Sequence, residues 1–232
     1  HGAVRFTGQA QFHPLEFIEA LSGDLTVYER TKVREVKGHE IMTDRGVVRA
    51  DHIVFACHYP FVNIPGFYFL RLYQEKSYVM ALGPVKELEG MYLGIDKNSY
   101  SFRSAGDTLL LGHGSHRTGK CPEKSPYEEM RRLKEHFYPG TEEFGRWSAE
   151  DCMSVDSVPY IGHFSGVLAD WYVATGFGKW GMTTSMAAAK IVAAQIMGRK
   201  TPYEEVFTPQ RFRPKAAAVT FLSHAGHSAA GL

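Results

Sequence analysis

The stretch Trp171-Tyr-Val-Ala-Thr-Gly-Phe-Gly-Lys-Trp-Gly-Met-Thr-Thr-Ser185, followed by an alanine-rich run to Gly198, decides how this chain is expected to fold. Its apolar start predicts a buried strand, its glycines predict a turn, and the residues after them predict the beginning of a helix. Glycines at 176, 178 and 181 let the backbone approach a ligand, because no Cβ stands in the way. The free N–H groups at a helix start favour electron-rich oxygens, so an anion or a ligand carbonyl would suit this turn. An ordinary strand–loop–helix connection fits the same spacing.

The composition of the 232 residues is that of an ordinary globular protein, with 44% hydrophobic and 22% charged residues. A formal net charge of +1 and scattered basic residues provide no general attraction to nucleic acid or membranes. No apolar run approaches the roughly 18 residues of a membrane span, and the first residues lack a signal-peptide pattern. We therefore expect a cytoplasmic protein with no nucleic-acid or membrane partner.

The cysteines and histidines do not predict a metal centre. Cys57, Cys121 and Cys152 form no CxxC pair, which argues against a zinc site and a disulfide framework. His113 and His116 come nearest to a ligand spacing, and a loop or strand-end position is the commoner role for such a pair. A cysteine-dependent enzyme using Cys57 or Cys152 is disfavoured, since Cys57 ends an apolar strand and no base is placed beside it.

The first third of the chain predicts a helix followed by a small sheet. A helix is expected over 15–21, with Pro14 in its first turn and Gly23 at its end. Turn residues then separate four short β-type runs, at 25–29, 32–36, 40–43 and 47–49. These runs predict an antiparallel meander. The apolar run 50–57 predicts a strand buried on both faces of a parallel sheet.

The chain changes character after Pro60. Residues 61–66 are expected to cross over to an antiparallel sheet, whose predicted strands are 75–82, 91–95, 100–103 and 108–112. Ser125 is expected to cap a helix that ends at Phe137. Residues 147–162 are then expected to return to the first region, which the strand and helix at 171–198 complete.

One element of a doubly wound nucleotide-binding sheet has no counterpart before residue 25. Such a sheet opens with a βαβ unit that carries GxGxxG, and nothing in the first residues resembles it. We therefore expect the chain to be a piece of a longer polypeptide.

Four passages carry a family resemblance, and together they span almost the whole chain. They are residues 8–14, residues 50–60, residues 147–162, and residues 172–198 with the short motifs at 202–203 and 207–209. In these passages the chain resembles FAD-dependent oxidoreductases of the D-amino-acid oxidase and glycine oxidase superfamily. It is most similar to the bacterial branch in which a C-terminal Rieske iron–sulfur domain follows the oxidoreductase. No Rieske signature of two Cys-x-His pairs is present in the sequence, so the resemblance again implies a fragment.

The resemblance implies a mixed α+β and α/β fold with two lobes. Residues 1–66 and 147–212 would form a partial FAD-binding lobe of the glutathione-reductase-like type. Residues 67–146 would form a substrate-binding lobe built on an antiparallel sheet with flanking helices, and 213–232 would be an extension or linker.

The resemblance also implies cofactor contacts residue by residue. Val33 would meet the adenine ring, and Ala56, Cys57 and His58 would approach the dinucleotide. The closing segment would hold the pyrimidine edge of the flavin through Gly176, Phe177, Gly178, Lys179, Trp180, Gly181, Met182 and Thr183. Negative charge on reduced flavin makes a helix N-terminus a suitable neighbour.

The antiparallel sheet supplies the candidates for a substrate pocket, Tyr73, Tyr78, Tyr100 and Arg103, with Arg103 holding a carboxylate through two hydrogen bonds. The alternative is that the tyrosines pack in the core and Arg103 is solvated. The region of Trp147 and Asp151 is a further place for a charged group. Asp156 is expected to cap a turn, although a functional role also fits.

The activity implied is oxidation of an amine or amino-acid C–N bond by hydride transfer to FAD, with no catalytic residue identified. Electrons would leave through a Rieske domain in the same polypeptide. The alternative is a cofactor-free, non-catalytic fragment that binds a substrate or partner.

Overall fold

The computed structural model describes residues 2–96, 99–120 and 122–211. The chain divides into two compact units between Ala50 and Asp51. The division into an FAD-binding lobe and a substrate-binding lobe stays a prediction. The extension expected at 213–232 lies outside the described residues.

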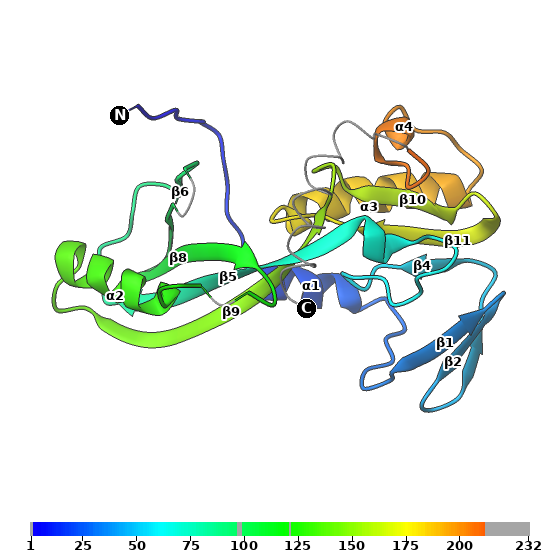
Figure 1. Cartoon of the computed structure of the whole chain (residues 1–232), viewed down its shortest axis with the longest axis horizontal. Helices are drawn as coiled ribbons and strands as arrows, with labels where there is room; N and C mark the ends of the chain where they lie inside the picture. The colour runs from blue at the N-terminus through cyan, green and yellow to red at the C-terminus, as the bar shows by residue number, and fades with distance from the viewer. Residues whose placement is uncertain (1, 97–98, 121, 212–232) are drawn as a thin grey trace. The chain divides into compact units, whose positions relative to one another are not determined.

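The N-terminal unit contains one helix and one small sheet (Figure 1). Helix α1 spans Pro14–Ser22, and the His13 ring accepts a hydrogen bond from the Glu16 amide at its start. Strands β1 (Val33–Lys37), β2 (Glu40–Thr43) and β3 (Val47–Arg49) form an antiparallel meander, as predicted.

The prediction of a strand over 25–29 is wrong, because these residues form turns and irregular backbone. A β-type run becomes a strand only when a neighbouring strand supplies its hydrogen bonds. In this sheet β1 is an edge strand that pairs with β2.

The first sheet of the second unit has the order β10-β11-β4. Its strands are β4 (Ile53–Phe55), β10 (Tyr160–Ser165) and β11 (Leu168–Thr175). The β10–β11 pair is antiparallel and the β11–β4 pair is parallel. Helix α3 (Gly181–Ile196) covers this sheet through a shared apolar core (Figure 1).

The strand predicted to be buried on both faces is shorter and less covered than expected. Ile53 and Phe55 are buried, but the Val54 side chain is 44% exposed. The prediction was wrong at Val54 because β4 is an edge strand among the described residues and its second face borders a cavity.

The second sheet of this unit is antiparallel, as predicted, with the order β6-β7-β8-β5-β9. Its strands are β5 (Leu72–Gly83), β6 (Tyr92–Leu93), β7 (Ser101–Ala105), β8 (Thr108–Arg117) and β9 (Glu142–Ser154). A 3₁₀ turn at Tyr68–Leu70 precedes β5. Strand β9 pairs with β5 along its whole length and so runs through residue 147, where a lobe boundary was expected.

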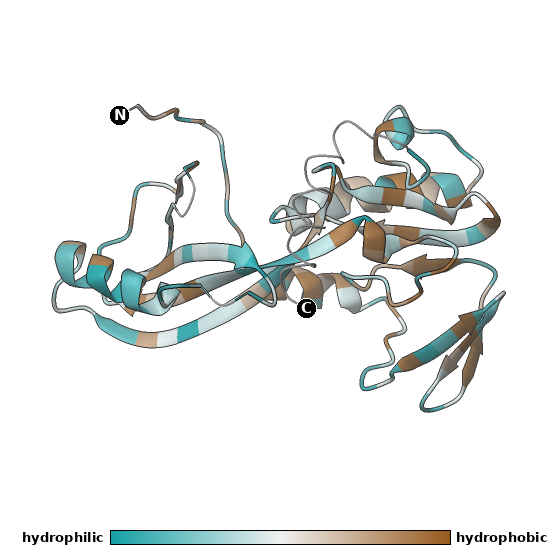
Figure 2. Cartoon of the chain, viewed as in Figure 1, coloured by the Kyte–Doolittle hydropathy of each residue, from teal (hydrophilic) through white to brown (hydrophobic). Residues whose placement is uncertain are grey.

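Helix α2 (Pro126–Phe137) lies on this sheet, and in Figure 2 most of it is hydrophilic. Its one large buried side chain, Met130, packs in a core with Met80, Leu82, Leu109 and Leu111. Ser125 caps the helix through its backbone carbonyl, which accepts from the amides of residues 128 and 129. The hydroxyl makes no capping bond.

A buried ion pair closes the end of the described chain onto β10. Short helix α4 (Glu204–Phe207) leads to Arg211, whose guanidinium makes a two-pronged salt bridge to Asp156 at 2.7 and 2.8 Å. Asp156 also accepts a hydrogen bond from the Val158 amide at 3.2 Å, which confirms the predicted turn-capping role. Among the helices within the described ranges, none has the length and apolar character that crossing a membrane requires.

Candidate functional site

The connection between β11 and α3 contains a glycine turn, residues 176–180. Gly176 and Gly178 adopt φ angles of +70° and +57°, in the left-handed region that favours glycine. A Cβ on Gly176 would lie 3.1 Å from Leu72 Cδ2 and 3.3 Å from Ser154 Cβ. Gly176 therefore allows the turn to press against the start of β5 and the end of β9.

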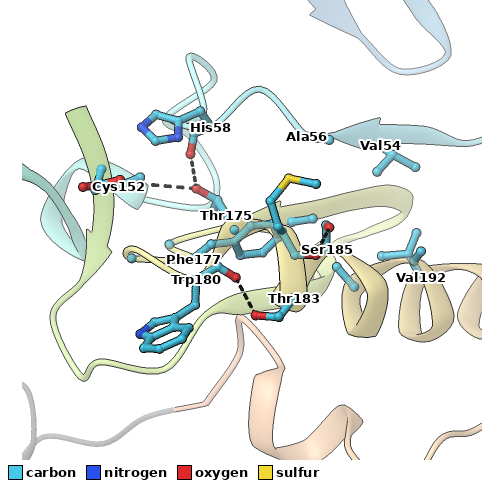
Figure 3. Close-up of a pocket in the computed structure, with 18 of the residues that line it drawn as sticks. Val54, Ala56, His58, Cys152, Thr175, Phe177, Trp180, Thr183, Ser185 and Val192 are labelled. Atoms are coloured by element: carbon cyan, nitrogen blue, oxygen red, sulfur yellow. Dashed lines mark hydrogen bonds between the residues drawn. The ribbon is translucent and has the colours of Figure 1, made fainter. Parts of the chain in front are cut away.

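Backbone and side-chain hydrogen bonds hold the glycine turn against β9. The Gly178 amide donates to the Cys152 carbonyl at 2.9 Å, and Met153 and Phe177 form a β-bridge. The Thr175 hydroxyl donates to the His58 carbonyl and contacts Cys152 Sγ at 3.5 Å (Figure 3). The end of β11, the loop after β4 and the end of β9 thus meet at the turn.

The first turn of α3 presents free backbone donors. The Thr184 amide makes the first helical bond, to the Trp180 carbonyl at 2.9 Å. Within the described residues, the amides of Gly181, Met182 and Thr183 donate no backbone hydrogen bond, as is normal for a helix start. A Cβ added at Gly181 would meet no atom within 4 Å. The helix N-terminus is therefore open to a ligand.

These groups border a cavity of about 800 Å³, a volume typical of cofactor and ligand sites. One wall is the apolar face of α3, formed by Ala188, Ala189, Val192, Ala193 and Ile196 (Figure 3 labels Val192). A second cavity, of about 500 Å³, shares the glycine turn as a wall.

Most of the predicted cofactor residues line the larger cavity. They are Ala56, His58, Gly176, Phe177, Gly178, Lys179, Trp180, Gly181, Met182 and Thr183. Cys57 is exposed in the same loop but does not line either cavity. Val33 lies in β1 of the N-terminal unit, and its contact with adenine stays a prediction.

The predicted substrate residues, in contrast, lie away from the walls of both cavities. Tyr78 donates to or accepts from His116 at 2.9 Å, and Tyr100 stacks on His113 with ring centroids 4.0 Å apart. Both tyrosines pack against the core of the five-stranded sheet, which favours the alternative, packing role. Tyr73 lies under the Arg117 guanidinium at 5.6 Å. Arg103 is half-buried on β7.

Polar side chains from three strands surround Lys179, and of this group the sequence pointed only to Lys179 and Asp151. We call it the lysine cluster: Glu75, Ser77, Ser115, Asp151 and Lys179. Lys179 Nζ donates to Ser77 Oγ at 2.9 Å and to Ser115 Oγ at 2.6 Å, and it lies 3.7 Å from Glu75. Ser77 donates onward to Asp151 at 3.3 Å, and Ser115 to Glu75 at 3.0 Å.

Asp151 and Lys179 reach the larger cavity from this cluster. Burial raises the pKa of Asp151, and the nearby Lys179 ammonium and the Ser77 hydroxyl reduce that rise without cancelling it. Trp147, the other residue of this region named from sequence, is 45% exposed on β9 and does not line the cavity.

The two described cysteines are not poised as nucleophiles. Burial raises the pKa of both Cys57 and Cys152, so the thiolate is disfavoured. His113 and His116 both lie on β8, and His113 bonds Glu129 at 2.9 Å. In the described ranges, no group of three or more His, Cys, Asp or Glu side chains is arranged to hold a metal ion.

Comparison with known proteins gives a consistent result. A family model described as FAD dependent oxidoreductase matches residues 1–195. The Bacillus subtilis (strain 168) protein named "Putative Rieske 2Fe-2S iron-sulfur protein YhfW" is 37% identical over 226 residues, which is 90% of this chain and 44% of that protein.

Two solved structures show the same fold. Glycine oxidase from Geobacillus kaustophilus superposes with a TM-score of 0.67 at 22% identity, over 80% of this chain and 53% of that chain. L-proline dehydrogenase from P. horikoshii gives 0.69 at 20% identity, over 84% and 57%. The chain therefore spans about half the length of the relatives that it matches, and the predicted mixed α+β fold is confirmed.

Proposed function

The chain belongs to the DAO family of FAD dependent oxidoreductases, and from this premise we propose that its full-length form oxidises a C–N bond of an amine or amino acid. One observation carries the proposal: the glycine turn and the free amides of α3 open onto a cavity of about 800 Å³.

The residues of the cavity fit FAD at the edge where the flavin carries negative charge. The amides of Gly181, Met182 and Thr183 would hold an oxygen of the ring, and the α3 dipole would favour the reduced, anionic form. The missing Cβ at Gly181 leaves space for the ring to approach the helix. Ala56 and His58 would border the dinucleotide.

FAD, when bound, supplies the two-electron acceptor for amine oxidation. The chain itself supplies position and exclusion of water. The apolar face of α3 removes water from one side, the glycine turn fixes the helix start, and the five-stranded sheet brings Asp151 and Lys179 to the remaining wall. Such a reaction depends on orientation of the substrate more than on an acid–base pair.

We further propose an electron-transfer partner in the same polypeptide. The relative named as a Rieske 2Fe-2S iron–sulfur protein aligns over 90% of this chain, and this chain accounts for only 44% of its length. In that arrangement electrons would leave the flavin through an iron–sulfur domain. A cytoplasmic location is part of this proposal.

The test is reconstitution of the full-length protein with FAD. We expect the purified protein to carry, or to take up, FAD in a one-to-one ratio, and to lose the absorption band of oxidised flavin when an amine substrate is added without oxygen. A full-length protein that contains no flavin and cannot be reconstituted with FAD would reject the proposal. That result would favour the alternative, a cofactor-free module that binds a substrate or partner.

A further inference from the structure

Among the described residues that line the larger cavity, one has an acidic side chain, Asp151. It lies near the end of β9, one residue before Cys152, whose carbonyl accepts from Gly178. The same backbone contact that holds the glycine turn therefore fixes Asp151 beside it. Asp151 thus lies on the cavity wall beside the glycine turn, next to the place proposed for the flavin edge.

The hydrogen bonds of Asp151 leave one of its oxygens available. Oδ2 accepts from the Ser77 hydroxyl at 3.3 Å. Within the described ranges, Oδ1 has no hydrogen bond and no basic group lies within 4 Å of the carboxylate. The half-buried carboxylate thus retains acceptor capacity, and the Lys179 ammonium and the Ser77 hydroxyl compensate its charge only in part.

Lys179, in contrast, is already compensated. Its ammonium has three donors, and it contacts Ser77, Ser115 and the Glu75 carboxylate. A substrate carboxylate at Lys179 would lie beside the Glu75 carboxylate, which repels it. The free donors of the cavity are the α3 amides, which the proposed flavin would use, whereas the Asp151 carboxylate keeps a free acceptor for a cation.

The arginines of the sheet do not give the cavity a binding site for an anion. No arginine lines either cavity within the described residues. Arg117 is a rival site for an anion, since it lies over the Tyr73 ring and its buried Nη1 has no hydrogen-bond partner among the described residues. It stands opposite Glu75 in the register, so a carboxylate of the chain is its neighbour. His58 lines the cavity as well and would add positive charge only when protonated.

We propose that Asp151 is the cation-binding group of the substrate site, and that the substrate is an aliphatic amine with a protonated nitrogen at this end rather than an amino acid with a carboxylate. The inference rests on the proposed function and names the substrate class for it. Asp151 orients the substrate by pairing with an ammonium group, while the C–N bond to be oxidised lies elsewhere in the molecule.

The experiment measures binding of three probes to the full-length protein by titration calorimetry: 1,4-diaminobutane, glycine and propionate. We expect 1,4-diaminobutane to bind at least tenfold more tightly than glycine, and propionate to bind weakest. Asp151→Asn, which keeps the shape and removes the charge, should weaken 1,4-diaminobutane binding at least tenfold.

The matched control is Glu150→Gln, which removes the same charge one residue away on the exposed, opposite face of β9. It should leave all three affinities unchanged. If Asp151→Asn does not fold, Asp151→Ser and the probe order of the unmodified protein decide the question. Tighter binding of glycine or propionate than of 1,4-diaminobutane would overturn the inference. So would binding of none of the probes, or an unchanged affinity for 1,4-diaminobutane in the Asp151 variant.

The two proposals fail separately. A protein that takes up no FAD but prefers 1,4-diaminobutane through Asp151 would reject the proposed oxidoreductase and keep the cation site. A protein that holds FAD and prefers glycine would keep the oxidoreductase and reject the cation site.

Discussion

Replacing Arg211 by alanine is expected to lower the free energy of unfolding by about 3–5 kcal/mol, because it leaves a buried carboxylate without its partner. The side chains of Arg211 and Asp156 are 5% and 4% exposed. Arg211 also donates to the carbonyls of Pro159 and Phe207, at 2.9 and 3.0 Å. Its guanidinium lies 4.0 Å from the Tyr160 ring. All of these contacts disappear together in the variant.

Urea unfolding of the full-length protein, followed by circular dichroism, measures this loss. Arg199→Ala is the matched control, since Arg199 is exposed and makes no side-chain hydrogen bond or ion pair within the described residues. Its effect should stay within about 0.5 kcal/mol. Equal midpoints for the two variants would show that the Asp156–Arg211 pair does not stabilise the fold.

The same pair predicts how this stabilisation depends on pH. Burial pushes the pKa of Asp156 upward, but the hydrogen bonds and charge of Arg211 outweigh it, so the folded-state pKa lies below its usual range. A carboxyl group with a depressed folded pKa stabilises the protein above its unfolded pKa of about 4 and loses that contribution as pH falls through the folded value. The difference between the unmodified protein and Arg211→Ala should therefore shrink over roughly pH 5 to pH 3.

The sequence predicts the glycine turn well because its signals are local. A continuous apolar run marks β11, and Gly176 and Gly178 mark backbone that turns there with positive φ. The meander and the antiparallel sheet follow from equally local patterns of β-branched residues and turns. The family resemblance added the cofactor, which spacing alone leaves open.

Contacts between residues that lie far apart in the chain could not be predicted from the sequence. Lys179 meets Ser77 and Ser115 across 102 and 64 positions, and Arg211 meets Asp156 across 55. Neither contact leaves a periodic trace in the chain. The tyrosines illustrate the reverse problem, since aromatic residues on a sheet are as suitable for a core as for a pocket. Only the fold shows Tyr78 and Tyr100 partly buried and packed against the core.

The substitution Gly181→Leu is expected to weaken FAD binding by the full-length protein at least 100-fold, about 2.7 kcal/mol. Gly181 is the first residue of α3 and lines the larger cavity, and a Cβ there would meet no atom within 4 Å. Its φ is not in the left-handed region, so leucine should not strain the backbone. The new side chain would instead occupy the space that the proposed flavin needs beside the helix start.

A graded series separates this steric effect from a disturbed helix. Loss of FAD affinity, measured by fluorescence quenching on titration, should increase from Gly181→Ala through Gly181→Val to Gly181→Leu, while the melting temperature of the apoprotein stays nearly constant. Gly166→Leu is the control, because a Cβ at Gly166 also meets nothing within 4 Å but the residue lies in the exposed turn between β10 and β11, outside both cavities. Unchanged FAD affinity in Gly181→Leu would place the cofactor away from the start of α3, and the glycine turn would then need another explanation.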